Sequence, residues 1–192
     1  MTDVKIHTKE SNDTKEQSGV LEHIKHPLED TWCIWLCTNN NSDWGKNLVN
    51  LASFDTVEDW WCLYHHMKLP SELEVGQDYA IFKKGISPTW EDEANTNGGR
   101  WIFSFGRNVS DLDSKWLLTV LILIGATLTE KAAVCGAVVN FRKDKIKIGI
   151  WITDASKKAK ILSIGNQMKF KMSFKKSINF HKHNEPINMY FI

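Results

Sequence analysis

The stretch CGAVVNFRKDKIKIGIWI, residues 135–152, sets the architecture expected of this chain. Two runs rich in β-branched and aromatic residues flank the polar pair Lys143-Asp144, a pattern typical of a β-hairpin with arms at 135–141 and 145–152. Every other residue of the second arm is isoleucine: Ile146, Ile148, Ile150 and Ile152. Because successive side chains of a strand point to opposite faces, the other face is expected to carry Lys145, Lys147 and Trp151. The hairpin therefore predicts a sheet with one apolar face and one cationic face.

The flanking sequence adds further strands and three helices. Strands are expected at 32–37 (apolar on both faces), at 78–84, at 100–105 and in short C-terminal runs. Helices are expected from the capping pair Asp55-Thr56 to about Lys68, from Ser110 with Asp113 to near Gly125, and over about 156–171. Residues 39–42 are interpreted as a loop that leads to Trp44 and an irregular polar stretch. The pattern predicts an α+β fold, a curved and mainly antiparallel sheet with its helices on one face.

Length and composition predict a single folded domain with a polar tail. The 192 residues are 42% hydrophobic, enough for one well-packed core but too few to expect two. Residues 1–25 contain no aromatic side chain and cannot bury enough apolar surface to offset the entropy of ordering. We therefore expect a disordered tail at 1–25 and one domain at 26–192.

Positive charge is concentrated in one region of an almost neutral chain. The formal net charge is +1, so general attraction to nucleic acid or to an anionic membrane is not expected. Residues 142–182 nevertheless hold 12 of the 24 Lys and Arg residues, with Asp144 and Asp154 as their only acidic residues. This segment is predicted to meet phosphate groups.

The cysteines and the hydropathy pattern indicate a reducing compartment. Cys33, Cys37, Cys62 and Cys135 form no C-x-x-C pair and no zinc spacing with histidine, so we expect four reduced core thiols and no metal site. The N-terminus is polar, and the longest apolar run, 116–126, is too short to span a membrane. A cytoplasmic or nuclear protein that does not bind membranes is expected.

Nine tryptophans are more than a core of this size needs. Trp44 and Trp90 are expected in separate loops, with Glu91 beside Trp90. Arg142, Lys147 and Trp151 lie on one hairpin. Each feature has an ordinary structural explanation, since a loop tryptophan usually fills a core and a strand lysine usually lies on the surface. Together they are consistent with a binding site.

From about His26 onward the chain resembles the eukaryotic translation initiation factor 4E family of messenger RNA cap-binding proteins. The matching motifs are His26-Pro27-Leu28 with Trp32 and Trp35, residues 54–61 (FDTVEDWW), residues 86–93 (ISPTWEDE), Gly98-Gly99-Arg100-Trp101, and residues 135–142 (CGAVVNFR). The family fold is a curved antiparallel sheet with three long helices on its convex face and the cap pocket on its concave face. The resemblance implies a monomer that needs no cofactor.

The resemblance assigns a role in cap binding to seven residues. Trp44 and Trp90 would stack on either side of the methylguanine, whose positive charge favours electron-rich rings. Glu91 would accept hydrogen bonds from N1 and N2 of the base, and Trp151 would lie against the methyl group. Arg142 and Lys147 would meet the phosphates, with Arg100 as a more distant support.

One phosphate position departs from the family pattern. The family usually has lysine two residues after the arginine, where this chain has Asp144 between Lys143 and Lys145. An exposed carboxylate near phosphate costs on the order of 1 kcal/mol. We therefore expect cap binding that is weakened about tenfold rather than abolished.

A second apolar surface is predicted on the helices. The helix from Thr56 carries Val57 and Trp61 at the edge of its apolar stripe, and 117–122 of the second helix adds leucines and isoleucine beyond the sheet-facing set. The resemblance implies that such a surface binds a partner helix with the motif Tyr-x4-Leu-apolar, from a scaffold initiation factor or a repressor. The matched positions are His26, Pro27, Leu28, Val57, Trp61, Leu117, Leu118, Leu121 and Gly125, with Leu118 where the family generally has glutamate.

Three functions are compared. The leading hypothesis is a cap-binding initiation factor that recruits a scaffold protein. The alternative is a diverged paralogue that holds the cap as a regulator or repressor, with weakened or altered scaffold binding, which Asp144 and Leu118 favour. An enzyme is disfavoured, because His65 and His66 are adjacent on a helix and point apart. His181 and His183, near the C-terminus, have no carboxylate partner in view, so no catalytic residue is expected.

Overall fold

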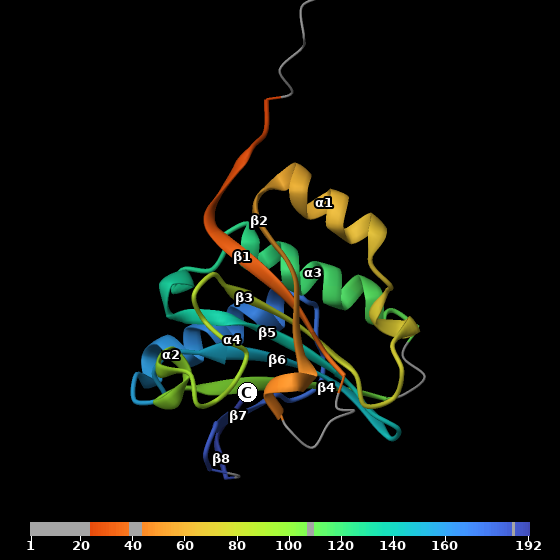
Figure 1. The fold of residues 1–192 in the computed structure, drawn as a ribbon. Helices are drawn as coiled ribbons and strands as arrows, with labels where there is room; N and C mark the ends of the chain where they lie inside the picture. Colours follow the sequence, from red (N-terminus) through yellow and green to blue (C-terminus); the bar gives the residue numbers. More distant parts are fainter. Residues whose placement is uncertain (1–23, 39–43, 107–109, 186) are drawn as a thin grey trace, which may run out of the picture.

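The computed structural model describes residues 24–38, 44–106, 110–185 and 187–192. Within them one antiparallel sheet of eight strands forms the body of the molecule (Figure 1), in the order β2-β1-β3-β5-β6-β4-β7-β8. The strands are β1 (Pro27–Cys37), β2 (Leu48–Thr56), β3 (Asp78–Lys83), β4 (Gly99–Gly106), β5 (Val134–Phe141), β6 (Lys145–Ile152), β7 (Asn179–Lys182) and β8 (Asn188–Phe191). The expected α+β fold with a curved antiparallel sheet is confirmed.

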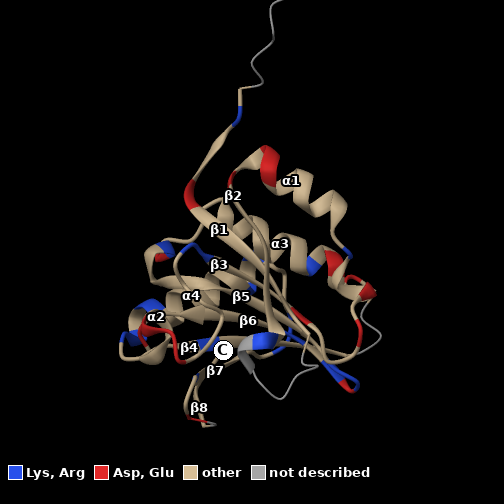
Figure 2. Ribbon diagram, viewed as in Figure 1, with Lys and Arg blue, Asp and Glu red and all other residues tan. Residues whose placement is uncertain are grey.

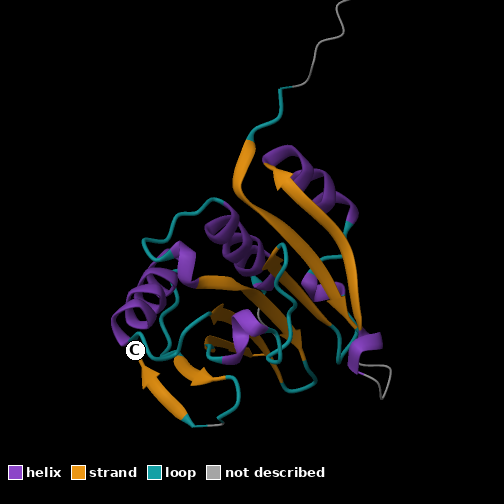
Figure 3. Ribbon diagram, turned by 60° about the vertical axis from the view of Figure 1, so that its left-hand side comes forward, coloured by secondary structure: helices purple, strands orange, loops and turns teal. Residues whose placement is uncertain are grey.

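Three long helices pack on one face of the sheet, as expected (Figure 3). They are α1 (Val57–His66), α3 (Leu112–Ile124) and α4 (Lys158–Lys171). A fourth, short helix, α2 (Glu93–Thr96), and the 3-10 turns η1 (Trp44–Asn47), η2 (Pro70–Glu72) and η3 (Lys131–Ala133) lie in the connections. The core between sheet and helices includes the buried indoles of Trp32, Trp60, Trp101 and Trp116.

The hairpin formed by β5 and β6 divides its side chains between the two faces as predicted. Ile146, Ile148, Ile150 and Ile152 lie in the core on the helix side. Lys145, Lys147 and Trp151 alternate with them and line a cavity on the opposite face. The polar, cationic face of the sheet is therefore free of the long helices.

Helix α1 begins where its capping sequence indicated. The Thr56 hydroxyl accepts a hydrogen bond from the Asp59 backbone N–H at 3.2 Å, which satisfies one donor of the first turn. The helix ends at His66, two residues before the expected end, and the chain passes through extended Met67 toward Pro70.

Four predictions about individual elements were wrong. The segment 48–56, interpreted mainly as irregular, forms edge strand β2 against β1, because an edge strand tolerates the polar residues that obscured its pattern. Ser110 and Asp113 do not cap α3; Asp111 occupies the N-cap position, and the Asp113 carboxylate instead accepts hydrogen bonds from the backbone N–H and hydroxyl of Ser71.

Ile122 was expected on the outer side of α3 but is 5% exposed, since it belongs to the core cluster and lines a small cavity with Trp32 and Leu128. Cys62 was expected to be a core thiol but is exposed on α1, whereas the other three cysteines are free and buried as predicted.

One expectation lies almost wholly outside the described residues. The tail predicted at 1–25 lies almost entirely within residues 1–23, which the structure does not describe. Among the helices that are described, none combines the length and the apolar character needed to cross a lipid bilayer. The described ranges also contain no cluster of three or more His, Cys, Asp or Glu side chains arranged to hold a metal ion.

Candidate functional site

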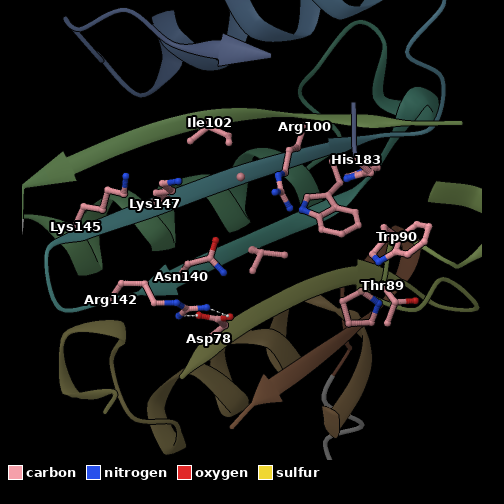
Figure 4. A pocket seen from close by; sticks show the side chains of 14 residues that line it. Asp78, Thr89, Trp90, Arg100, Ile102, Asn140, Arg142, Lys145, Lys147 and His183 are labelled. Carbon is pink, nitrogen blue, oxygen red and sulfur yellow. Dashed lines mark hydrogen bonds and ion pairs between the residues drawn. The ribbon is translucent and has the colours of Figure 1, made fainter. Parts of the chain in front are cut away.

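A cavity of about 480 Å³ opens on the sheet face opposite the long helices (Figure 4). Strands β3 to β6 supply most of its wall, and the turn before α2 and the segment after β7 close one end. Its lining consists of Asp78, Pro88, Thr89, Trp90, Arg100, Ile102, Val138, Asn140, Arg142, Lys145, Lys147, Gly149, Trp151 and His183. Aromatic rings gather at one end and cations at the other (Figure 4).

The aromatic end is built around Trp151. This indole is 6% exposed and packs edge-on against Phe82, with 5.3 Å between ring centroids. The imidazole of His183 lies against it at a centroid distance of 3.9 Å, and the Arg100 guanidinium lies over it at 5.7 Å. Residues on β3, on β4 and after β7 thus hold the Trp151 indole of β6 in place as one aromatic wall.

Trp90 stands at the mouth of the cavity and is 52% exposed. Buried polar contacts hold the turn that presents it. The Asp92 carboxylate accepts hydrogen bonds from the backbone N–H groups of Ser87 and Ala94, and the Asn95 amide donates to the carbonyl oxygens of Ser87 and Thr89. Asn95 is completely buried, so the base of the turn is rigid while its exposed indole is free to meet a ligand.

The cationic end follows the β5–β6 hairpin, where Figure 2 shows Lys and Arg gathered. The Arg142 guanidinium makes a two-point ion pair with the buried Asp78 carboxylate, one of whose contacts is 2.9 Å. The hydrogen bond to Asp78 raises the pKa of Arg142. Burial lowers the pKa of Lys147, and so do the nearby charges of Lys145, Arg100 and Arg142. These cations repel one another, and a bound anion would relieve that repulsion.

His183 is neutral in this environment. Burial, and secondly the Arg100 charge, lower the pKa of its imidazole to about 3. Both ring nitrogens are inaccessible to solvent and have no hydrogen-bond partner among the described residues. The ring therefore acts as an aromatic surface against Trp151 rather than as a charged group.

The Cys135 thiol, which packs with Trp151, is also unreactive. Burial raises the pKa of Cys135 to about 12, so the thiol stays protonated and is a poor nucleophile. Its sulfur lies 3.7 Å from the Ala94 carbonyl oxygen and packs beneath Trp151. This arrangement favours binding over covalent chemistry.

The cavity brings together five of the seven residues assigned to cap binding: Trp90, Trp151, Arg100, Arg142 and Lys147. Arg100, expected as a more distant support of the phosphates, lies over the Trp151 ring. Glu91 is exposed in the turn after Trp90 and does not line the cavity. The Trp44 backbone begins η1, but its side chain lies outside what the structure describes.

Sequence reasoning missed Asp78, Asn140 and His183. Asp78 and Asn140 are paired across β3 and β5, and both sit on the polar face defined by Lys147 and Trp151. Strand alternation gave a signal for Asp78, two positions before the small Ala80 on the same face. His183 gave none, because it follows the last residue of a short strand. Asp144 is exposed at the hairpin turn and does not line the cavity.

The nine residues assigned to partner binding gather where β1 begins and where α1 and α3 lie. Val57 is 38% exposed, and Trp61, Leu117, Leu118 and Leu121 are half-buried around the core. The exposed segment His26-Pro27, followed by half-buried Leu28, is tied to α1, since the Val57 N–H donates to the His26 carbonyl oxygen at 2.9 Å.

Charged contacts add to that tie. His26 also contacts Glu58 at 2.6 Å, and its side-chain and backbone hydrogen bonds lower the pKa of that carboxylate to about 2. Gly125 is exposed at the end of α3. An apolar surface with partly exposed aromatic and aliphatic side chains therefore lies on the helix side, opposite the cavity.

Comparison with known proteins assigns the chain to a family. The family profile described as eukaryotic initiation factor 4E matches residues 27–190. The chain belongs to this family. Among curated relatives, eukaryotic translation initiation factor 4E-1A of Danio rerio is 45% identical over 168 residues, covering 84% of this chain and 78% of the relative. The human factor 4E is 44% identical over 165 residues, covering 83% and 76% of the two chains.

Solved structures of the family superpose closely on this 4E chain. Ascaris suum eIF4E-3 in complex with an m7G cap gives a TM-score of 0.84 at 36% identity and covers 88% of this chain and 98% of its own. C. elegans eIF4E-3 in complex with the 4E-binding protein Mextli and a cap analog gives 0.84 at 34% identity, with coverage of 88% and 100%. Both solved structures are complexes with a cap or a cap analog, and the C. elegans structure also contains a 4E-binding protein.

Proposed function

We propose that this 4E chain binds the N7-methylguanosine cap of messenger RNA in the cavity and recruits a scaffold protein for translation initiation through its helix side. The observation that carries the proposal is the single cavity that joins a tryptophan wall to a row of cations (Figure 4). Relatives solved with cap and with 4E-binding proteins support the same pair of ligands. They favour an initiation factor over a diverged regulator.

The aromatic end suits a cationic base. N7-methylation gives guanine a positive charge, which is attracted to the faces of indole rings by roughly 2 kcal/mol per desolvated contact. We assign one face of the base to Trp90, the other to Trp44, and the methyl group to Trp151. Because His183 is neutral and stacks on Trp151, it adds no repulsion to this end of the cavity.

Glu91 is assigned to the N1–H and N2–H donors of the base. A carboxylate that accepts both makes two charge-assisted hydrogen bonds, each stronger than a neutral one. Since Glu91 is exposed in the same turn as Trp90, cap binding would have to turn both side chains inward together. Asp92 and Asn95 would hold the base of the turn in place during that change.

The cationic end suits the triphosphate. Arg142 is held by Asp78 with its guanidinium in the cavity wall, and Lys145 and Lys147 extend the positive row along β6. Arg100 lies between this row and the aromatic wall. Phosphate oxygens would satisfy these donors and relieve the repulsion that, after burial, lowers the pKa of Lys147.

On the helix side we propose docking of a partner helix carrying Tyr-x4-Leu-apolar. The leucine-bearing face of such a helix would bury Val57, Trp61, Leu117 and Leu121, which are partly exposed in the free chain. We also propose that the protein acts in the cytoplasm and catalyses no reaction. Incubation with a capped dinucleotide, followed by chromatography, should return the dinucleotide intact.

Retention on methylguanosine-triphosphate resin tests the proposal. Wild type should be retained, eluted by free cap analogue and not eluted by GTP. Trp90→Ala and Trp61→Ala form a reciprocal pair, since both remove a partly exposed indole. Trp90→Ala should lose the resin and keep a scaffold peptide, whereas Trp61→Ala should do the reverse. Equal effects of the two variants on both ligands would contradict the assignment of two separate surfaces.

A single-charge pair refines the phosphate assignment. Lys147→Ala removes a cation from the cavity, and Lys84→Ala removes one from an exposed turn outside it. Only Lys147→Ala should weaken retention, by about fivefold or more. Thermal melts of all four variants establish that loss of binding is not loss of fold.

A further inference from the structure

A second cationic surface lies where α4 ends and the chain turns toward β7. Phe170, on the last turn of α4, is 83% exposed, as much as any large apolar side chain described. It borders a shallow hollow of about 350 Å³ lined by Asn166, Lys169, Phe170, Ser173, Phe174 and Lys175. Lys171 and Lys176 are exposed beside it. We call Phe170 with Lys169, Lys171, Lys175 and Lys176 the Phe170 surface.

The four lysines of the Phe170 surface differ from other described surface lysines in their ion pairing. Among the described residues none of the four makes an ion pair, although other surface lysines do, such as Lys160 with Glu130 and Lys182 with Glu185. Lysine near a helix C-terminus is favoured by the helix dipole, which accounts for Lys169 and Lys171 but not for Lys175, Lys176 or the exposed ring. An unpaired cation cluster around an aromatic ring is the composition that binds single-stranded nucleic acid, where rings stack on bases and lysines meet phosphates.

The Phe170 surface adjoins the phosphate end of the cavity across one open strand edge. Strand β7 pairs with β4 only as far as Ile102, so Phe103–Gly106 has no strand on that side in the described part of the chain. On its other side β4 pairs with β6, and Ser104 lies opposite Lys147. Phe174 packs on Phe103 and Phe105 at centroid distances of 5.2 and 5.3 Å.

The segment carrying Lys175 and Lys176 is therefore held beside the stretch of β4 in which Ser104 is paired with Lys147, a residue of the cavity wall. Neighbouring strands are about 4.8 Å apart, so a few nucleotides are enough to pass from Lys147 over this edge. Figures 1 and 3 show α4 leading by a short loop into β7 beside β4.

We propose that the Phe170 surface is an accessory site for the single-stranded RNA that follows the cap. An unpaired base stacks on Phe170, and the backbone phosphates lie along Lys169, Lys171, Lys175 and Lys176, without base specificity. The inference rests on the proposed cap binding, because the cap tethers the following nucleotides near the open edge and raises their effective concentration. The same chemistry would also attract an acidic peptide or an anionic membrane, but neither is delivered to this edge by the cavity.

The test compares a cap dinucleotide with an unstructured capped 12-nucleotide RNA. Affinities are measured by anisotropy at two salt concentrations. The wild type should bind the capped RNA more tightly than the dinucleotide. Phe170→Ala should weaken binding of the RNA about fivefold or more, because loss of one base stack costs at least about 1 kcal/mol. The affinity for the dinucleotide should not change.

Replacing Lys171, Lys175 and Lys176 together by alanine should reduce the salt slope of RNA binding by about 2. The matched control removes Lys157, Lys158 and Lys160 at the other end of α4 and should leave that slope unchanged.

Other results would contradict either the accessory site or the proposed cap binding. If the wild type gains nothing from the longer RNA, or if Phe170→Ala binds it as tightly as wild type, the accessory site is wrong. If the dinucleotide itself does not bind, the proposed function fails, and uncapped RNA of the same sequence decides the Phe170 surface alone through the same variants. If the variants lose binding to poly-glutamate or to phosphatidylserine vesicles but not to RNA, the surface serves another ligand class and the proposal is overturned.

Discussion

His183 should make the protein lose stability as the pH falls from 7 to 5, and His183→Phe should remove that loss. The imidazole is half-buried against Trp151, with both nitrogens inaccessible and without a partner among the described residues, and its pKa is lowered to about 3. Phenylalanine keeps a ring of similar size in the stack but cannot take up a proton. It also removes two buried polar atoms, so its stability at pH 7 should equal or exceed that of wild type.

The magnitude follows from proton linkage. The folded pKa lies below the unfolded value of 6.5, so the unfolded chain binds more protons between pH 6.5 and about 3. The stabilising contribution of neutral His183 is therefore complete above pH 6.5 and is lost as the pH falls below it. At 1.36 kcal/mol per pKa unit, the free energy of unfolding should drop by at most about 2 kcal/mol between pH 7 and pH 5. Carboxylates such as Glu58, with a pKa of about 2, contribute only at lower pH.

Urea unfolding followed by tryptophan fluorescence at pH 7, 6 and 5 measures this difference. Wild type and His66→Phe, a variant on α1 that retains His183, should both show the drop, and His183→Phe should be flatter by about that amount. If His183→Phe loses as much stability as wild type over this range, the ring nitrogens of His183 are not shielded from water as the structure shows.

Three further outcomes are expected. Asp144→Lys should tighten cap binding by up to about fivefold at low salt and have little effect at high salt, because Asp144 is exposed at the hairpin turn; fluorescence titration at both salt concentrations measures this. Leu118→Glu should raise affinity for a scaffold peptide about 3- to 10-fold in calorimetry, by restoring attraction to a basic residue of the partner helix. Gly165→Ala should destabilise by about 1–3 kcal/mol in urea, since the added methyl carbon would lie 2.5 Å from the Trp101 ring, whereas Asn166→Ala on the exposed side of α4 should not.

Local patterns predicted those parts of the fold that depend on one segment at a time. The alternating isoleucines of β6 defined the two faces of the sheet, and Thr56 with Asp59 defined the start of α1, because both signals are carried by neighbouring residues. Strand β2 was missed since its apolar residues do not alternate regularly with polar ones, and two of them, Val49 and Leu51, are exposed at the sheet edge.

The residues of the site also differ in whether one segment was enough to predict them. Lys145, Lys147 and Trp151 were placed correctly because the hairpin is local, although Asn140 on its first arm was not named. His183 was not, since its place depends on which strands are neighbours, and no single segment encodes the order β3-β5-β6-β4-β7. Alternation within β3 indicated the face of Asp78, but its position opposite Asn140 depends on the same strand order. The resemblance to a family named residues but gave no position for Arg100 against Trp151, which only the pairing of β4 with β6 creates.

The register of β4 ties the cavity to the core behind it. Arg100 pairs with Trp151 on β6 and with His181 on β7, while the next residue, Trp101, points to the helix side and donates its indole N–H to the Ile161 carbonyl oxygen at 2.8 Å. A slip of one residue would exchange the two faces, placing Arg100 in the core and Trp101 in the cavity. The close approach of α4 at Gly165 to the Trp101 ring holds that register in place. A substitution that wedges α4 away from Trp101 should therefore weaken cap binding as well as stability, although it touches no residue of the cavity.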